Sequence, residues 1–161
     1  MKSSLDDFSL ILESAQRIYA FTPERYEDLI DDSNGVVQDA LCMRFQVIGE
    51  TLNRIRSKYP EDYERYERAE WQYLIAIRNI ISHSYVSVDF AVLWDVAQNK
   101  LPELMSDFER IIDEMQETTL TNKAPEGASI RRRPPGLHCV LYLVVPLYVG
   151  SASGRYPPHT P

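Results

Sequence analysis

The stretch VVQDALCMRFQVIGETLNRIRSK, residues 36–58, carries the clearest structural pattern in the chain. Its apolar side chains recur every three or four positions, as on one face of an α-helix. They are Val36, Val37, Ala40, Leu41, Phe45, Ile48, Leu52 and Ile55. The preceding DDSNG (31–35) is typical of a turn, and Tyr59 ends the pattern because the residue before a proline disfavours the helical conformation. We therefore predict one long helix over 36–58.

The same periodicity continues on both sides of this stretch. Upstream, it predicts a helix over 5–21. Thr22 followed by Pro23 is typical of the start of a second, short helix that runs to Ile30. Downstream, it predicts a helix over 71–83.

A last helix is expected over 89–116, and Pro102 should kink or split it because proline removes a backbone donor. The charged segment EDYERYERAE (61–70) is expected to be a loop or a short exposed helix. Strand-like alternation longer than a few residues does not occur in the first 117 residues. We therefore predict an all-α fold, a bundle of four to five helices.

The composition changes near residue 117. Residues 1–117 hold 12 basic and 23 acidic side chains, whereas residues 118–161 hold five and one. The first part has two glycines and three prolines, and the second has four and seven. Because both residue types oppose helix formation, we predict a helical domain over 1–117 and an irregular tail over 118–161 that is not part of it. The apolar tail segment LHCVLYLVVPLYV (137–149) is assigned no function.

Several classes of protein are excluded by composition. Two cysteines are too few for a disulfide scaffold or a cysteine-rich zinc module. No apolar run reaches the roughly 18 residues that span a bilayer, and the first residues do not read as a secretory signal. We expect a cytoplasmic protein without a membrane partner. We expect no cofactor and no metal, because no Gly-rich phosphate loop or zinc spacing occurs, and Asp31, Asp32 and Asp39 lack the spacing of a calcium loop.

His83 is the one histidine of residues 1–117, and it lies in RNIISHSY (78–85) near the end of a predicted helix. At about 100° per residue, Arg78 and Tyr85 lie within about 20° of each other around the helix axis, and His83 lies about 140° from Arg78. The three side chains meet only if the helix ends there or another surface closes the pocket. The alternative is a helix C-terminus whose cations favour the helix dipole. The residues alone leave both open.

Arg78 to Tyr85 matches the pattern R-x-x-x-x-H-x-Y, and further blocks accompany it in order. They are MRFQVIGETL (43–52), Trp71, Asn79, Leu93-Trp94 and NKLP (99–102). Together they resemble the HepT-like toxins of the HEPN superfamily, which are also grouped as DUF86 proteins. The resemblance covers about residues 5–116 and leaves the tail unexplained.

The resemblance implies a HEPN-type bundle that is a metal-independent endoribonuclease acting on tRNA or mRNA, the toxin of a type VII-like toxin–antitoxin pair. It implies that Arg78 and His83 are catalytic. Cleavage without a metal needs a base for the 2′-hydroxyl, an acid for the leaving 5′-oxygen and a cation for the phosphorane charge. Histidine is the residue type that titrates near neutral pH, and arginine can hold phosphate oxygens with two hydrogen bonds.

If the site is that of a ribonuclease, two further residues are expected to support it. Asn79 is expected to orient the phosphate or the histidine, and Glu50 to pair with Arg78 across the bundle, unless Glu50 is an ordinary surface residue. One histidine cannot easily be both base and acid in a single step. A homodimer would place one Arg78 and one His83 from each protomer in a cleft, in agreement with HEPN relatives, whereas water as the acid is the alternative.

The resemblance also implies a partner, a minimal nucleotidyltransferase (MNT) antitoxin that transfers AMP from ATP to Tyr85. The added nucleotide places bulk and negative charge where the RNA phosphate must lie. A non-catalytic binding partner of the nucleotidyltransferase and a nucleotide-binding module remain as alternatives.

The acidic balance of residues 1–117 opposes RNA binding unless basic side chains gather near the cleft. The candidates are Arg44, Arg54, Arg56, Lys58, Arg65 and Arg68.

Overall fold

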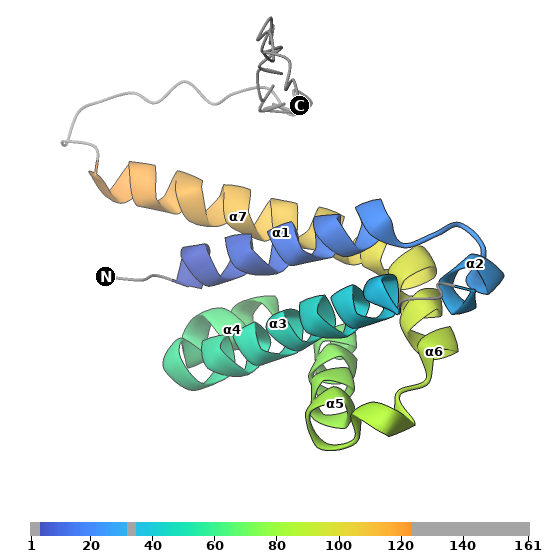
Figure 1. The fold of residues 1–161 in the computed structure, drawn as a ribbon. Helices are drawn as coiled ribbons and strands as arrows, with labels where there is room; N and C mark the ends of the chain where they lie inside the picture. Colours follow the sequence, from blue (N-terminus) through green and yellow to red (C-terminus); the bar gives the residue numbers. More distant parts are fainter. Residues whose placement is uncertain (1–3, 32–34, 124–161) are drawn as a thin grey trace, which may run out of the picture. The chain divides into compact units, whose positions relative to one another are not determined.

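The structure, a computed structural model, describes residues 4–31 and 35–123, and this part of the chain is all-α as predicted (Figure 1). Its helices are α1 (Ser4–Phe21), α2 (Tyr26–Ile30), α3 (Val36–Lys58), α4 (Pro60–Tyr66), α5 (Ala69–His83), α6 (Phe90–Asp95) and α7 (Leu101–Lys123). A 3₁₀ turn, η1 (Tyr85–Ser87), and a π-helical segment (Val96–Lys100) join the later helices. These described residues hold seven α-helices, more than the predicted four to five, because α4 is a helix of its own and the last predicted helix is divided into α6 and α7.

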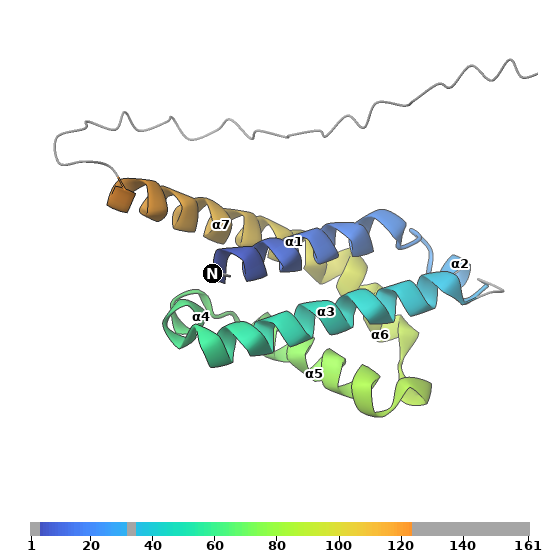
Figure 2. The same ribbon diagram turned by 60° about the vertical axis from the view of Figure 1, so that its left-hand side comes forward.

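The long helix α3 lies at the centre of the bundle. Figures 1 and 2 both show α1 and α7 on one side of α3 and α5 on the other. The predicted apolar stripe of α3 is buried from Leu41 to Ile55, whereas Val36 at the first position is exposed. Burial of the stripe supplies the main stabilisation, since each fully buried aliphatic or aromatic side chain contributes roughly 1.5–3 kcal/mol. None of the described helices is long and apolar enough to cross a membrane.

An aromatic cluster joins four helices on the α1 side of the bundle. The Trp71 ring stacks on Phe108 with ring centres 5.8 Å apart, and Phe8 lies 5.8 Å from Trp71. Tyr63 and Tyr66 of α4 contact Trp71 and Phe8. The segment 61–70 was expected to be a loop or a short exposed helix, and its first part does form a short helix, α4. This helix is not fully exposed, because its two tyrosines are buried.

Pro102 splits the last predicted helix, as expected. It is the second residue of α7, and α7 directly follows the π-helical segment, where the Leu101 amide donates to the Val96 carbonyl five residues earlier. Proline has no amide hydrogen for the α-helical bond to the carbonyl four residues before it, so the wider π turn forms where that bond is missing. Trp94 Nε1 and Gln98 Nε2 both donate to the Pro23 carbonyl at 2.9 Å and attach this bend to the segment before α2.

The helix α7 continues to Lys123, so residues 118–123, which the sequence analysis placed in the irregular tail, are helical. Residues 124–161, including the apolar segment 137–149, lie outside the described residues. The domain boundary at residue 117 and the separate nature of the tail stay predictions.

Candidate active site

Gly49 allows α3 and α5 to approach each other closely. A Cβ atom at this position would lie 2.4 Å from Arg78 Cβ and 2.8 Å from the Leu74 carbonyl oxygen. No ordinary side chain fits in that space, because real Cβ atoms do not approach other heavy atoms so closely. The glycine therefore brings the backbone of α3 against the first part of the Arg78 side chain.

Arg78 is held from two sides. Its Nη2 forms an ion pair with Glu50 Oε2 at 2.6 Å, and its Nη1 donates to Asn79 Oδ1 at 3.1 Å. Its Nε is buried and has no hydrogen-bond partner among the described residues. The predicted contact between Glu50 and Arg78 across the bundle is thus present. Asn79 contacts Arg78 itself, and the sequence analysis did not anticipate this contact.

His83 is the last residue of α5, and its side chain is exposed. The helix ends there because Ser84 leaves the helical conformation while its amide still donates to the Ile80 carbonyl at 2.8 Å. Within residues 4–31 and 35–123, no hydrogen-bond or ion-pair partner is found for His83. The helix end required by the motif is therefore present, but one chain does not bring His83 into contact with Arg78 or Tyr85.

Tyr85 begins the η1 turn and is 48% exposed. Its hydroxyl donates a hydrogen bond to Asp39 Oδ1 in the first turn of α3. This hydrogen bond is the main reason that the pKa of Tyr85 rises to about 12. The contact was not predicted, since Asp39 was considered only as a residue of an acidic turn.

Three polar contacts connect α3 with the motif, and they run in opposite directions along the two helices. Glu50 meets Arg78, Gln46 Nε2 lies 3.4 Å from Ser82 Oγ, and Asp39 meets Tyr85. Later residues of α3 pair with earlier residues of α5, so the helices are antiparallel. We call these three pairs the α3–α5 polar contacts. One face of α3 thereby contacts Arg78, Ser82 and Tyr85.

Three exposed apolar side chains lie on the elements that carry the α3–α5 polar contacts. Met43 of α3 is 59% exposed, Ile80 of α5 is 50% exposed, and Val86 in η1 is 98% exposed. Exposed apolar side chains can pack against another protein where they form a contiguous patch.

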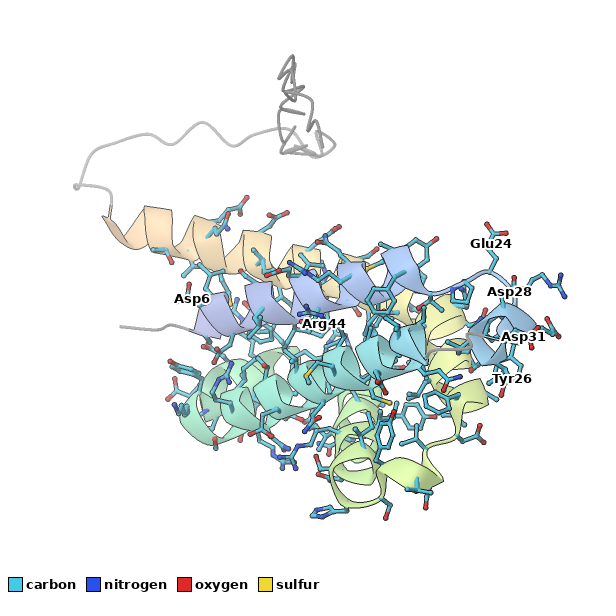
Figure 3. All side chains as sticks on the ribbon, viewed as in Figure 1. Asp6, Glu24, Tyr26, Asp28, Asp31 and Arg44 are labelled. Carbon is cyan, nitrogen blue, oxygen red and sulfur yellow. The ribbon has the colours of Figure 1, made fainter. Side chains whose placement is uncertain are left out.

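The basic residues proposed to gather near the site are largely engaged elsewhere. Arg54 pairs with Asp7 of α1 at 2.8 Å, and Arg68 pairs with Asp107 of α7 at 3.5 Å. Arg65 lies over the Tyr66 ring at 5.0 Å. Figure 3 shows acidic side chains, including Glu24, Asp28 and Asp31, around α2. Three of the six candidate basic residues, Arg54, Arg65 and Arg68, thus contact residues outside the motif.

In the described part of the chain, no three His, Cys, Asp or Glu side chains come together as a candidate metal site. The side chains that can act at the motif are a fixed guanidinium, an exposed imidazole, a carboxamide and a phenol. The first two are the groups that acid–base cleavage of a phosphodiester needs.

The fold and the site together define a class of protein: an antiparallel helical bundle that presents an Arg-x-x-x-x-His pair at the end of a helix. Residues 11–111 match the HepT-like family, which is described as "Ribonuclease HepT-like". This match covers more than half of the chain, and the chain belongs to the HepT-like ribonuclease family.

Individual relatives agree with this family. "Putative RNase MJ0125" of Methanocaldococcus jannaschii is 31% identical over 109 residues, which is 66% of this chain and 89% of the relative. "Probable ribonuclease HepT" of Thermococcus cleftensis is 31% identical over 114 residues, 69% of this chain and 98% of the relative.

A third relative is a longer protein. "Gamma-glutamylcyclotransferase and putative RNase MJ0434" of Methanocaldococcus jannaschii is 29% identical over 105 residues, 65% of this chain. The chain spans only 46% of that relative's length. No solved structure matches the chain.

Proposed function

We propose that this protein is a metal-independent endoribonuclease in which Arg78 and His83 carry the cleavage of RNA. The 2′-hydroxyl attacks the adjacent phosphorus, the bond to the 5′-oxygen breaks, and a 2′,3′-cyclic phosphate remains. His83 moves a proton in this reaction, and Arg78 stabilises the charge of the phosphorane. The substrate is tRNA or mRNA.

The observation that carries the proposal is the state of Arg78 beside the end of α5. Glu50 and Asn79 hold the guanidinium at 2.6 and 3.1 Å, and its Nε has no partner among the described residues. A guanidinium held in this way can bind a phosphate oxygen through the N–H groups of Nη1 and Nη2 that these two contacts do not use, because little side-chain freedom remains to be lost on binding. His83, five residues later, is exposed at the helix end where it can reach a substrate.

We infer that the active form is a homodimer. A single His83 gives one proton donor or acceptor, and the reaction needs both. Met43, Ile80 and Val86 are exposed on α3, α5 and η1, and they offer apolar contacts to a second copy. In the dimer, the second His83 supplies the missing acid or base.

The proposal includes control by a partner, a minimal nucleotidyltransferase antitoxin that transfers AMP to Tyr85. The half-exposed hydroxyl of Tyr85 is accessible to such an enzyme and lies two residues from His83. A phosphodiester there repels the RNA phosphate. The protein is then the toxin of a toxin–antitoxin pair.

Digestion of total cellular RNA in EDTA tests the nuclease. Wild type should leave 2′,3′-cyclic phosphate ends, and His83→Ala should be inactive while it folds normally. Glu64→Gln, an exposed change on α4, is the matched control and should cleave like wild type. Full cleavage by His83→Ala would refute the mechanism. No cleavage by wild type shown by mass spectrometry to be unmodified would favour a binding partner without nuclease activity.

Mass spectrometry after co-expression with a minimal nucleotidyltransferase tests the control site. Wild type should carry AMP on the peptide that contains Tyr85, and Tyr85→Phe should carry none and still cleave RNA. AMP on the same peptide of Tyr85→Phe would place the modification at another residue.

A further inference from the structure

The η1 turn, Tyr85–Ser87, is attached to the bundle almost entirely through one side chain. None of its three residues is buried, and Val86 is 98% exposed. Its own backbone bonds are local: the Ser87 amide donates to Ser84, and the Val88 amide donates to Tyr85. The described side-chain hydrogen bond from this turn to another element is the one from Tyr85 to Asp39 of α3.

The segment is anchored on both sides of this turn. Before it, the Ser84 amide donates to the Ile80 carbonyl at 2.8 Å and closes α5. After it, Val88 packs against the core, and Asp89 caps α6 by accepting from the Ala91 amide at 2.9 Å. A movement of the turn therefore acts first on these two anchors, the end of α5 and the start of α6.

We propose that Asp39 is the positioning residue for Tyr85, and that esterification of the Tyr85 hydroxyl with a phosphate group releases the η1 turn from α3. The inference rests on the proposed function, in which Tyr85 is the residue that the partner modifies. It adds a conformational part to that control. The contact holds the turn only while the hydroxyl is free.

Two physical effects of esterification act in the same direction. The oxygen of Tyr85 loses the hydrogen that it donates to Asp39, so the hydrogen bond cannot persist. The new phosphodiester carries a negative charge and would lie against the carboxylate of Asp39, where like charges repel. Asp39 is in the first turn of α3, where the helix dipole favours its negative charge.

Release of the turn affects the site because His83 lies only two residues before it. The Ser84 amide closes the last turn of α5, and this last turn carries His83. A turn that leaves α3 pulls on this end and loosens the helix terminus, since terminal helical turns fray easily. Modification then lowers activity through displacement of His83 in addition to blocking the phosphate position.

Hydrogen exchange at the Ser87 and Val88 amides tests the contact on the full chain without RNA or nucleotidyltransferase. Tyr85→Phe removes the donor, and Asp39→Ala removes the acceptor. Both should exchange about three- to tenfold faster than wild type, the effect of one lost hydrogen bond. Asp39→Asn, which keeps an acceptor oxygen, should stay closer to wild type, and Glu64→Gln on α4 should not differ from it.

The charge effect is tested with sulfotyrosine at position 85, introduced by amber suppression. Its sulfate ester carries one negative charge, as the phosphodiester of an adenylylated tyrosine does. Exchange should be faster than in Tyr85→Phe, and Asp39→Asn in the sulfotyrosine protein should slow it again. A pure loss of packing would not be reversed by this second change.

Each outcome has a separate meaning. Wild-type exchange in both Tyr85→Phe and Asp39→Ala would refute the positioning role of Asp39. Equal exchange in the sulfotyrosine protein and in Tyr85→Phe would refute release by charge. Failure of the proposed function shows elsewhere, as intact RNA with wild type or as a missing AMP group, and does not alter the exchange rates.

Discussion

The helix α3 makes an ion pair on each of its two faces, and the two pairs are built differently. On the α1 side, Arg54 binds Asp7 through Nε at 3.1 Å and Nη2 at 2.8 Å. On the α5 side, Glu50 contacts Arg78 through one Nη2–Oε2 pair of 2.6 Å. The Asp7 side chain is 5% exposed, whereas the Glu50 side chain is 54% exposed.

This difference separates an arginine that holds the fold from one that can bind a ligand. Arg54 uses its planar edge on a buried carboxylate, and the hydrogen bond to Asp7 raises the pKa of Arg54. Arg78 contacts an exposed glutamate through Nη2 alone, and only its buried Nε has no partner in the described part of the chain. Both sites contain an arginine that forms an ion pair with a carboxylate. Burial of the carboxylate differs, and so does the number of arginine nitrogens that contact it, two in Arg54 and one in Arg78.

The largest expected effect is on RNA cleavage, which should depend on Arg78 and not on Arg54. Arg78→Ala should reduce RNA cleavage about 10³-fold, because the charge of the transition state loses its cation. Its unfolding free energy should fall by less than about 1 kcal/mol, since a half-exposed pair contributes little. Cleavage assays and urea unfolding measure both. Arg54→Ala is the opposite control, and an equal loss of activity there would remove the distinction.

The next effect concerns stability on the α1 side. Asp7→Asn should lower the unfolding free energy by about 2 kcal/mol, because Arg54 loses its charged partner while most of the shape is kept. Cleavage per folded molecule should remain that of wild type. Chemical unfolding and an activity assay below the transition check this. An unchanged unfolding free energy would show that the buried pair gives no net stability.

The smallest effect concerns the close approach at Gly49. Gly49→Ala adds a methyl group 2.4 Å from Arg78 Cβ, and overpacking costs about 1–3 kcal/mol, offset by the roughly 1 kcal/mol that alanine gains over glycine in a helix. The net loss should be about 1 kcal/mol, with weaker cleavage because Arg78 moves.

Gly35→Ala is the matched control for this change. Gly35 has a φ of +64° and no atom within 4 Å of the added position, so the substitution strains the start of α3 without touching the site. Both variants should lose stability to a similar extent, and only Gly49→Ala should lose activity. Equal activity in the two would show that Arg78 tolerates the displacement.

Much of the fold could be predicted from the sequence because helix periodicity is a local property. The bounds of α3 agree with the prediction over 36–58, and Pro102 splits the last helix where its missing amide requires it. The prediction was less accurate for 61–70. Its charges indicate exposure, but Tyr63 is buried against Trp71 and Tyr66 against Phe8, and Phe8 is distant in sequence.

For the candidate site, one contact was predicted from the sequence and another was missed. The spacing of Arg78, His83 and Tyr85 within one short segment is visible in the sequence, and the Glu50–Arg78 pair follows from the motif blocks. The partner of Tyr85 was missed, because Asp39 is 46 residues away and nothing local distinguishes it from the other acidic residues around it. The catalytic roles and the dimer stay predictions.

The sequence by itself determined the helices, the end of α5 at His83 and membership of the HepT-like ribonuclease family, since these depend on local spacing and residue type. The tertiary structure decided which face of α3 supports the motif. That choice depends on how closely α3 and α5 pack. Gly49 allows the close approach because it has no side chain between the two helices. From this packing follow the held Arg78 and the contact of Tyr85 with Asp39, because an antiparallel pair of helices brings together residues far apart in the chain.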